Sequence, residues 1–207
     1  MAIVIITGPP GAGKSTVAAR LAAASTLAVH LDGDQVFHWI SAGYAEPWQP
    51  GTSHQNGTVI GAIAAAAVSF ADGGYEVFVD AILGPWFLPH WLHAAGRGRP
   101  VHYVVLRPSR RVAAGRATSR RAPGDLTDPE PVAAMFDAFE DLGTFEEHVL
   151  DSSGQDTDAT VAAVRQGSRT GRYLLDAGRA AADMDRLARK FGIDPPSRWL
   201  GPSGAGS

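Results

Sequence analysis

The most constraining feature of this sequence is an eight-residue segment that follows a short apolar run near the N-terminus. Residues 8–15 read GPPGAGKS and match the pattern G-x-x-x-x-G-K-[ST] without a mismatch. Given 24 glycines, two lysines and 24 serines plus threonines in 207 residues, chance produces such a match in roughly 0.003 of chains. The apolar run at residues 3–6 and the helical segment that follows provide the setting in which backbone N–H groups surround polyphosphate oxygens. The segment therefore predicts a nucleoside triphosphate-binding loop between a strand and a helix.

The residue types of this loop have distinct physical roles. Its glycines permit positive φ and let the backbone come close to phosphate. Lys14 supplies a cation to the β- and γ-phosphates, and Ser15 offers a hydroxyl to Mg²⁺. A compact ammonium fits between phosphates where a planar guanidinium does not, and Lys14 is one of two lysines beside 16 arginines. The alternative is a glycine-rich turn before a helix. The expected nucleotide-binding residues here are Gly8, Gly11, Ala12, Gly13, Lys14, Ser15 and Thr16.

Short β-branched runs alternate with longer alanine-rich segments as far as about residue 166, which predicts the α/β class. The runs lack strict polar–apolar alternation, as in a parallel sheet covered by helices on both faces. Strands are expected at residues 3–6, 28–31, 76–79, 101–106 and 148–150. Helices are expected at residues 13–24, 34–41, 56–71, 87–95, 109–119, 129–142 and 157–166. With the loop, this order predicts a P-loop NTPase fold built on a five-stranded parallel sheet. Asp128 should cap the 129–142 helix, and Gly143 should follow its end.

Composition limits the remaining possibilities. The 207 residues, 45% hydrophobic and 19% charged, predict one core domain with an appendage. A net charge of −3 makes nucleic acid and anionic membranes poor partners. The longest apolar stretch, residues 57–71, is shorter than the roughly 20 residues of a membrane-spanning helix, and no signal peptide is recognisable. Without cysteine there is no disulfide or thiolate chemistry, and we expect a cytoplasmic protein.

The alternation of strands and helices stops after about residue 167. Residues 176–191 carry apolar side chains at helical spacing, and the last seven residues have the composition of a flexible tail. We expect a P-loop domain over residues 1–166 and an amphipathic helix with a flexible tail over residues 167–207. The apolar face of this helix should pack back on the domain or form a homodimer, with binding to a partner protein as the alternative.

Acidic residues follow two of the predicted strands. Asp80 ends one of them and, with Ser15, is suited to hold Mg²⁺; a helix cap is its alternative role. Asp32 and Asp34 follow the second strand. Because parallel strands present their carboxyl ends at one edge, all three should converge on the loop. Ala81 stands where water-activating ATPases often carry a glutamate, and the guanine-reading Asn-Lys-x-Asp of GTPases is absent.

In these segments the chain resembles the small-molecule P-loop kinases, among them gluconate kinase, adenylylsulfate kinase and chloramphenicol phosphotransferase-like proteins, and AAA-type nucleotide-binding proteins more widely. The resemblance covers about residues 1–166 and rests on the loop and on Asp32-Gly33-Asp34. It implies an ATP- and Mg²⁺-dependent transfer of the γ-phosphoryl group to a hydroxyl of a small molecule, either a metabolite or an antibiotic. It also implies that Asp34 is the catalytic base, supported by Asp32; capping of the following helix is the alternative role of Asp34.

Arginines are concentrated after the fourth predicted strand. Six fall within residues 107–121, where uniform scatter predicts about one. A solvated helix face is the alternative, although such faces normally mix both signs. The resemblance implies a lid whose guanidiniums stabilise the transferred phosphoryl group. It assigns catalytic lid roles to Arg116, Arg120 and Arg121, and it places Arg107 near the adenine with residues 151–154.

Ten of the 17 aromatic residues lie within residues 37–91, where the resemblance places the acceptor pocket. Phe70 and Phe78 are expected in the core. An aromatic mini-core beneath a long loop is the alternative for the others. The expected acceptor-binding residues, several of them beside glycine and proline breaks, are Asp32, Asp34, Trp39, Tyr44, Trp48, His54 and Trp86.

Two other functional classes stay open at this point. One is a regulatory ATPase whose nucleotide state controls a binding surface. The other is a kinase of a different substrate, either a zeta-toxin-like kinase acting on nucleotide sugars or a nucleic-acid 5′-kinase that uses the arginine segment. The overall negative charge makes nucleic acid the less favoured substrate.

Overall fold

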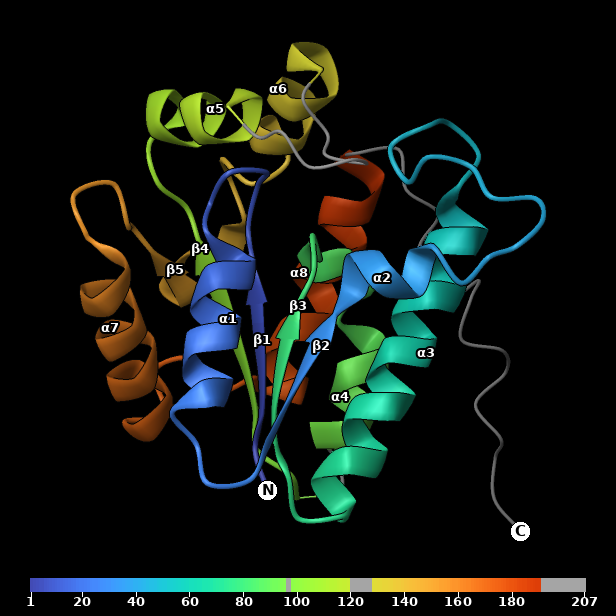
Figure 1. The fold of residues 1–207 in the computed structure, drawn as a ribbon. Coiled ribbons are helices and arrows are strands. Elements are labelled where there is room, and N and C mark those ends of the chain that lie inside the picture. Colours follow the sequence, from blue (N-terminus) through green and yellow to red (C-terminus); the bar gives the residue numbers. More distant parts are fainter. Residues whose placement is uncertain (96–97, 120–127, 191–207) are drawn as a thin grey trace, which may run out of the picture.

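The computed structural model describes residues 1–95, 98–119 and 128–190. Its centre is a parallel five-stranded sheet in the order β2-β3-β1-β4-β5 (Figure 1). The strands are β1 (Ile3–Thr7), β2 (Ala28–Asp32), β3 (Glu76–Asp80), β4 (Val101–Leu106) and β5 (Val149–Leu150). The predicted α/β class and five-stranded parallel sheet are confirmed.

Helices cover both faces of the sheet, as the continuous apolar strands predict (Figure 1). One face carries α1 (Lys14–Ala23) and α7 (Thr157–Arg169). The other carries α3 (Ser53–Asp72), α4 (Pro89–Ala95) and α8 (Ala177–Lys190). Beyond the carboxyl ends of the strands lie α5 (Arg110–Thr118) and α6 (Pro129–Asp137). Shorter elements are α2 (Gly33–Phe37) and the 3₁₀ helices η1 (Pro85–Phe87) and η2 (Gly143–His148).

Alternation along each strand divides the buried side chains between two cores. Ile3 and Ile5 of β1 pack in the core beneath α3, α4 and α8, whereas Val4 and Ile6 pack beneath α1 and α7. Phe78 of β3 lies in the second core, as predicted, and is 3% exposed. Phe70 was expected in the core, but its side chain is 39% exposed and makes an edge contact with Tyr75 near the end of α3. That prediction is wrong.

Two predicted helices end early. The helix expected at residues 34–41 ends at Phe37, where a series of turns begins. The helix expected at residues 129–142 ends at Asp137, although Asp128 caps it as predicted. Carbonyls of Phe139 and Glu140 accept hydrogen bonds from the Arg107 guanidinium, so distant side-chain donors satisfy groups that a continued helix would use. Gly143 consequently opens η2 instead of following the helix.

Helix α8 packs back on the sheet domain. Its residues Met184, Leu187 and Ala188 are at most 5% exposed and belong to the core that contains Ile3 and Ile5. Lys190 donates to Asp141 at 3.0 Å at the end of the helix. This part of the apolar face therefore packs back on the domain, which is one of the two arrangements expected from the sequence. No helix in residues 1–95, 98–119 and 128–190 is long and apolar enough to cross a membrane.

Candidate active site

The segment between β1 and α1 adopts the geometry of a phosphate-binding loop. Gly8, Gly11 and Gly13 have φ angles of 138°, 78° and 92°. Gly13 precedes the first residue of α1, so backbone N–H groups at this helix end face the space above the loop. A Cβ atom added at Gly13 would meet nothing within 4 Å, and this space is therefore open. The loop can receive an anion at a helix N-terminus, as its sequence predicts.

Gly8 is required by packing as well as by its backbone conformation. A Cβ atom there would lie 2.0 Å from the Leu106 carbonyl oxygen at the end of β4. We expect Gly8→Ala to lower the free energy of unfolding by about 3 kcal/mol, since strain at positive φ adds to a backbone clash. Gly13→Ala carries the strain without the clash and should cost about 1 kcal/mol. Urea unfolding of both variants measures the difference; equal losses would contradict it.

Lys14 is buried and bent back over the loop. Its side chain is 8% exposed, and its ammonium donates to the Pro9 carbonyl oxygen at 3.2 Å. The positive charge of Lys14 is therefore held at the loop, next to the open space beside Gly13. This position agrees with the predicted role of Lys14 toward phosphate oxygens.

The predicted acidic residues meet at the same edge of the sheet. Asp80 is aligned with Asp32 on β2 and with Ile6 on β1, the second residue before the loop. Its side chain is 4% exposed, and Oδ2 lies 3.7 Å from His30 Nε2. A buried carboxylate beside the loop, with the Ser15 hydroxyl at the start of α1, is a donor set that Mg²⁺ accepts.

Asp32, rather than Asp34, caps helix α2. Oδ1 of Asp32 accepts from the Asp34 amide at 3.0 Å, and Oδ2 accepts from Gln35 Nε2 at 3.0 Å. The alternative in which Asp34 is the cap is therefore wrong. Asp34 is exposed in the first turn of α2 and close enough to Tyr44 to affect its ionisation. Burial, the hydrogen bond to Glu46 and the negative charges of Glu46 and Asp34 raise the pKa of Tyr44 to about 12.

Three of the predicted acceptor-binding side chains are exposed in the segment between α2 and α3. Trp39, Tyr44 and Trp48 are 73%, 36% and 40% exposed. Tyr44 donates to Glu46 at 3.0 Å and lies near His38, with ring centroids 6.1 Å apart.

Side chains at the start of α3 and in η1, among them the predicted acceptor residues His54 and Trp86, have different environments. Gln55 pairs with both backbone groups of Ala45, and the Asn56 amide donates to the Pro47 carbonyl, so these two fasten the segment to α3. His54 is exposed at the start of α3. Trp86 is 5% exposed within η1, so it belongs to the core and not to a loop wall.

A cavity of about 230 Å³ adjoins the other side of the loop. It lies between the start of α1, Arg116 of α5 and the segment that joins β5 to α7. Ser152 Oγ and Gln155 Oε1 are buried there, and neither has a hydrogen-bond partner among the described residues. Such groups carry an energetic cost that a bound ligand can remove. The lining residues are Ala12, Gly13, Thr16, Val17, Arg116, Ser152, Gln155, Asp156, Thr157 and Thr160.

The arginines of residues 107–119 have separate environments; among them, Arg116 is the one predicted for a lid, and Arg107 is predicted near the adenine. Arg107 forms a bidentate pair with Glu146 at 2.8 and 2.7 Å, which directs it into the η2 region and away from the cavity. Arg110 packs over the Phe136 ring and pairs with Asp137 and Glu140 of the following segment. Arg116 lines the cavity, and its role toward the transferred phosphoryl group stays a prediction. Arg120 and Arg121 lie outside the described residues.

The family of the chain follows from a comparison with protein-family models. A model described as AAA domain matches residues 3–142, more than half of the sequence. The chain belongs to the AAA domain family. This membership confirms the resemblance to AAA-type P-loop proteins predicted from the loop. None of the curated proteins compared with the chain matches it significantly.

Solved structures share the fold of this AAA domain. The tunicamycin resistance protein of Deinococcus radiodurans is 17% identical to this chain, with a TM-score of 0.55. The match covers 85% of this chain and 99% of that protein. A gluconokinase from Sinorhizobium meliloti 1021 is 20% identical, with coverages of 82% and 92% and a TM-score of 0.57. A sugar kinase from Janibacter sp. HTCC2649 is 17% identical, with coverages of 84% and 94% and a TM-score of 0.55. At these identities the likeness establishes the fold, and it confirms the predicted P-loop architecture.

Sequence reasoning did not single out several polar residues of the AAA domain site. Thr7 is fully buried at the end of β1, where its hydroxyl accepts from the Leu83 amide and donates to the Leu83 carbonyl. Gln155 and Asp156 line the cavity, and Asp156 caps α7. Two signals were available: a threonine directly before the loop, and an aspartate that precedes a predicted helix.

The pair between Arg107 and Glu146 predicts a pH dependence of stability. The hydrogen bonds from Arg107 lower the pKa of Glu146 in the folded protein. The stabilisation is therefore complete above the unfolded-state pKa of about 4.3 and is lost as the pH falls through the lowered folded-state value. Glu146→Gln should lose less stability than wild type between pH 6 and pH 3, as measured by urea unfolding. Parallel pH curves for the two proteins would contradict this assignment.

Proposed function

We propose that this AAA domain protein is an ATP-dependent, Mg²⁺-requiring kinase that phosphorylates a hydroxyl of a small molecule. The observation that carries the proposal is the convergence of the loop with Asp32, Asp34 and Asp80 at one edge of the sheet. A phosphoryl donor and a carboxylate on its acceptor side are the minimum that such a transfer needs.

The nucleotide side of the site is supported by the loop and the 230 Å³ cavity. Backbone N–H groups at the start of α1 and the Lys14 ammonium would hold phosphate oxygens. The cavity next to Gly13 and Thr16 could receive the adenine of the nucleotide. Ser152 Oγ and Gln155 Oε1, which lack hydrogen-bond partners among the described residues, would be available to it there. Arg116 lies at its edge and can contact phosphate oxygens.

Mg²⁺ would be held by the Ser15 hydroxyl and by Asp80, directly or through water. When bound, it supplies positive charge that neutralises phosphate oxygens. The Asp80 carboxylate is buried at the end of β3, where its Oδ2 lies 3.7 Å from His30 Nε2.

Asp34 is the proposed base because the Asp32 carboxylate is occupied in capping α2. The acceptor hydroxyl oxygen forms a bond to the γ-phosphorus while the bond from that phosphorus to the β–γ bridging oxygen breaks. The acceptor proton passes to the Asp34 carboxylate, and the products are ADP and a phosphate monoester.

The acceptor side is supported by exposed aromatic rings in the segment that follows α2, of which Tyr44 lies close enough to Asp34 for the two to interact electrostatically. Tyr44, Trp39 and Trp48 lie between α2 and α3, and such rings favour a ring-bearing acceptor. Two structural neighbours, a tunicamycin resistance protein and a gluconokinase, suggest which compounds to test first. Sugar acids, sugars and nucleoside antibiotics therefore form the first panel.

The test is an incubation of the protein with γ-labelled ATP, Mg²⁺ and each compound of the panel, followed by separation of the products. A labelled phosphate monoester formed in the presence of one acceptor supports the kinase. Slow release of labelled phosphate that no hydroxyl compound changes would support the regulatory ATPase instead. Phosphorylation of oligonucleotide 5′ ends, or of nucleotide sugars, would move the acceptor to those classes.

A further inference from the structure

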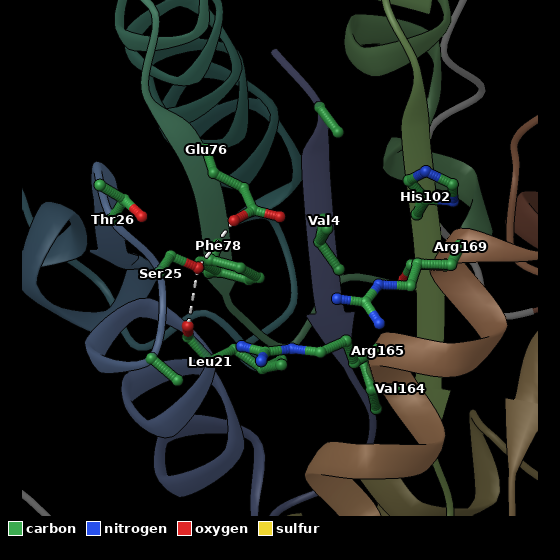
Figure 2. A pocket seen from close by; sticks show the side chains of 13 residues that line it. Val4, Leu21, Ser25, Thr26, Glu76, Phe78, His102, Val164, Arg165 and Arg169 are labelled. Carbon is green, nitrogen blue, oxygen red and sulfur yellow. Dashed lines mark hydrogen bonds between the residues drawn. The ribbon is translucent and has the colours of Figure 1, made fainter.

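A second cavity lies at the opposite end of the sheet from the phosphate-binding loop (Figure 2). Its volume is about 430 Å³, within the range of roughly 300–1,000 Å³ typical of small-molecule sites. It is bounded by the amino-terminal parts of β1, β3 and β4, by the end of α1 and by α7. None of the residues discussed for phosphoryl transfer lines it.

The strands contribute both apolar and polar side chains to the floor of this cavity. Val4, Phe78 and His102 lie on the sheet face that α1 and α7 cover, because side chains two residues apart share a face. Leu21 of α1 and Val164 of α7 add apolar surface to the walls. An apolar ring or chain of a ligand would therefore find contacts across the floor.

One wall of the cavity is basic. Arg165 and Arg169 lie four residues apart on α7, so both side chains project from the same face of the helix. Figure 2 shows both guanidiniums extending from α7 across the sheet, toward α1 and β1. Within the described residues neither guanidinium is within ion-pair distance of a carboxylate. The carboxylate of the cavity, Glu76, accepts instead from the Ser25 hydroxyl at 2.7 Å on the opposite side.

Two further polar atoms of the cavity are buried and lack a hydrogen-bond partner among the described residues. They are Nδ1 of His102 and Oγ of Ser168. His102 is 7% exposed, and its burial together with the nearby His148 lowers its pKa, so the ring is neutral at neutral pH. The positive charge of the cavity therefore comes from the two arginines, and a neutral imidazole and a hydroxyl remain for hydrogen bonds.

We propose that this cavity is a binding site for a small organic anion, with a carboxylate or phosphate group held by Arg165 and Arg169 and an apolar body on Val4 and Phe78. Guanidinium forks match the geometry of both oxyanions, so the two groups share one recognition chemistry. The site lies at the far end of α1 from the phosphate-binding loop and does not depend on the proposed kinase activity.

The test uses ¹⁵N-labelled protein titrated with benzoate, phenyl phosphate and the neutral analogue benzyl alcohol at constant ionic strength. Benzoate or phenyl phosphate should shift the amide signals of Ser25, Arg165 and Ser168 in a saturable manner, and benzyl alcohol should not. Whichever anion binds more tightly identifies the preferred oxyanion. Arg165→Ala and Arg169→Ala should each weaken binding at least fivefold, and the double variant should abolish it.

Arg20→Ala is the matched control. Arg20 pairs with Asp158 between α1 and α7 but does not line the cavity, so this variant removes the same charge and should keep affinity within twofold of wild type. Shifts confined to residues 11–15 would show that the anion binds the phosphate-binding loop, and that result would overturn the proposal. Equal effects of the three single variants, or no saturable shift with either anion, would also overturn it.

Discussion

Replacing Lys14 by alanine is expected to reduce nucleotide affinity at least 100-fold. The ammonium is buried at the loop, where it is held by the Pro9 carbonyl, and its loss leaves phosphate oxygens without their charged donor. Charge-assisted hydrogen bonds to phosphate contribute about 3 kcal/mol in such a setting, which corresponds to roughly 100-fold. Calorimetric titration with a non-hydrolysable ATP analogue and Mg²⁺ measures the effect.

The chain provides its own control, since Lys190 is the other of its two lysines. Lys190 pairs with Asp141 at the end of α8 and is 40% exposed. Lys190→Ala should therefore leave nucleotide affinity unchanged and lower stability by about 0.5 kcal/mol at most. Equal affinities of the Lys14 variant and wild type would show that the loop does not bind the nucleotide through this side chain.

Asp34→Asn should reduce kcat by about 10²- to 10⁴-fold, because the amide cannot accept the proton of the acceptor hydroxyl. Nucleotide affinity should stay within about twofold, since the loop and the cavity do not include this side chain. Steady-state kinetics with the acceptor found in the labelling assay, together with the ATP-analogue titration, separate the two effects.

Asp32→Asn is the informative comparison because asparagine caps helices about as well as aspartate. Asp32 binds the Asp34 amide and Gln35, so this variant tests the capping carboxylate without removing the cap. Its activity should fall less than tenfold. A large loss in the Asp32 variant alongside a fully active Asp34 variant would transfer the role of base to Asp32.

Local sequence patterns were sufficient for the sheet, the loop and the acidic edge. The strands around Val4 and Phe78 could be recognised from neighbouring apolar residues, and the glycines of the loop from their spacing. Asp80 and Asp32 could be placed together because parallel strands end at one edge, and the register confirms this. These inferences needed no knowledge of which helix packs on which strand.

Contacts between distant segments explain what the sequence did not reveal. Arg107 could not be separated from Arg116 by composition, since its partner Glu146 lies 39 residues away. Trp86 resembled a loop residue beside Gly84 and Pro85, but packing within the core buries it. The end of α6 depends on the same Arg107, whose donors reach carbonyls more than 30 residues along the chain. Side-chain pairing over such separations has no signature in a single sequence.

The hydrogen bonds around Leu83 have a consequence for how the edge of the sheet beside the loop can move. The Thr7 hydroxyl on β1 engages both backbone groups of Leu83, and the Tyr103 hydroxyl on β4 donates to its carbonyl at 2.8 Å. The segment after β3 is thus held by hydrogen bonds from two strands, so we expect this part of the sheet edge to move little. Any movement of the exposed segment between α2 and α3 would then take place against this fixed part of the sheet edge.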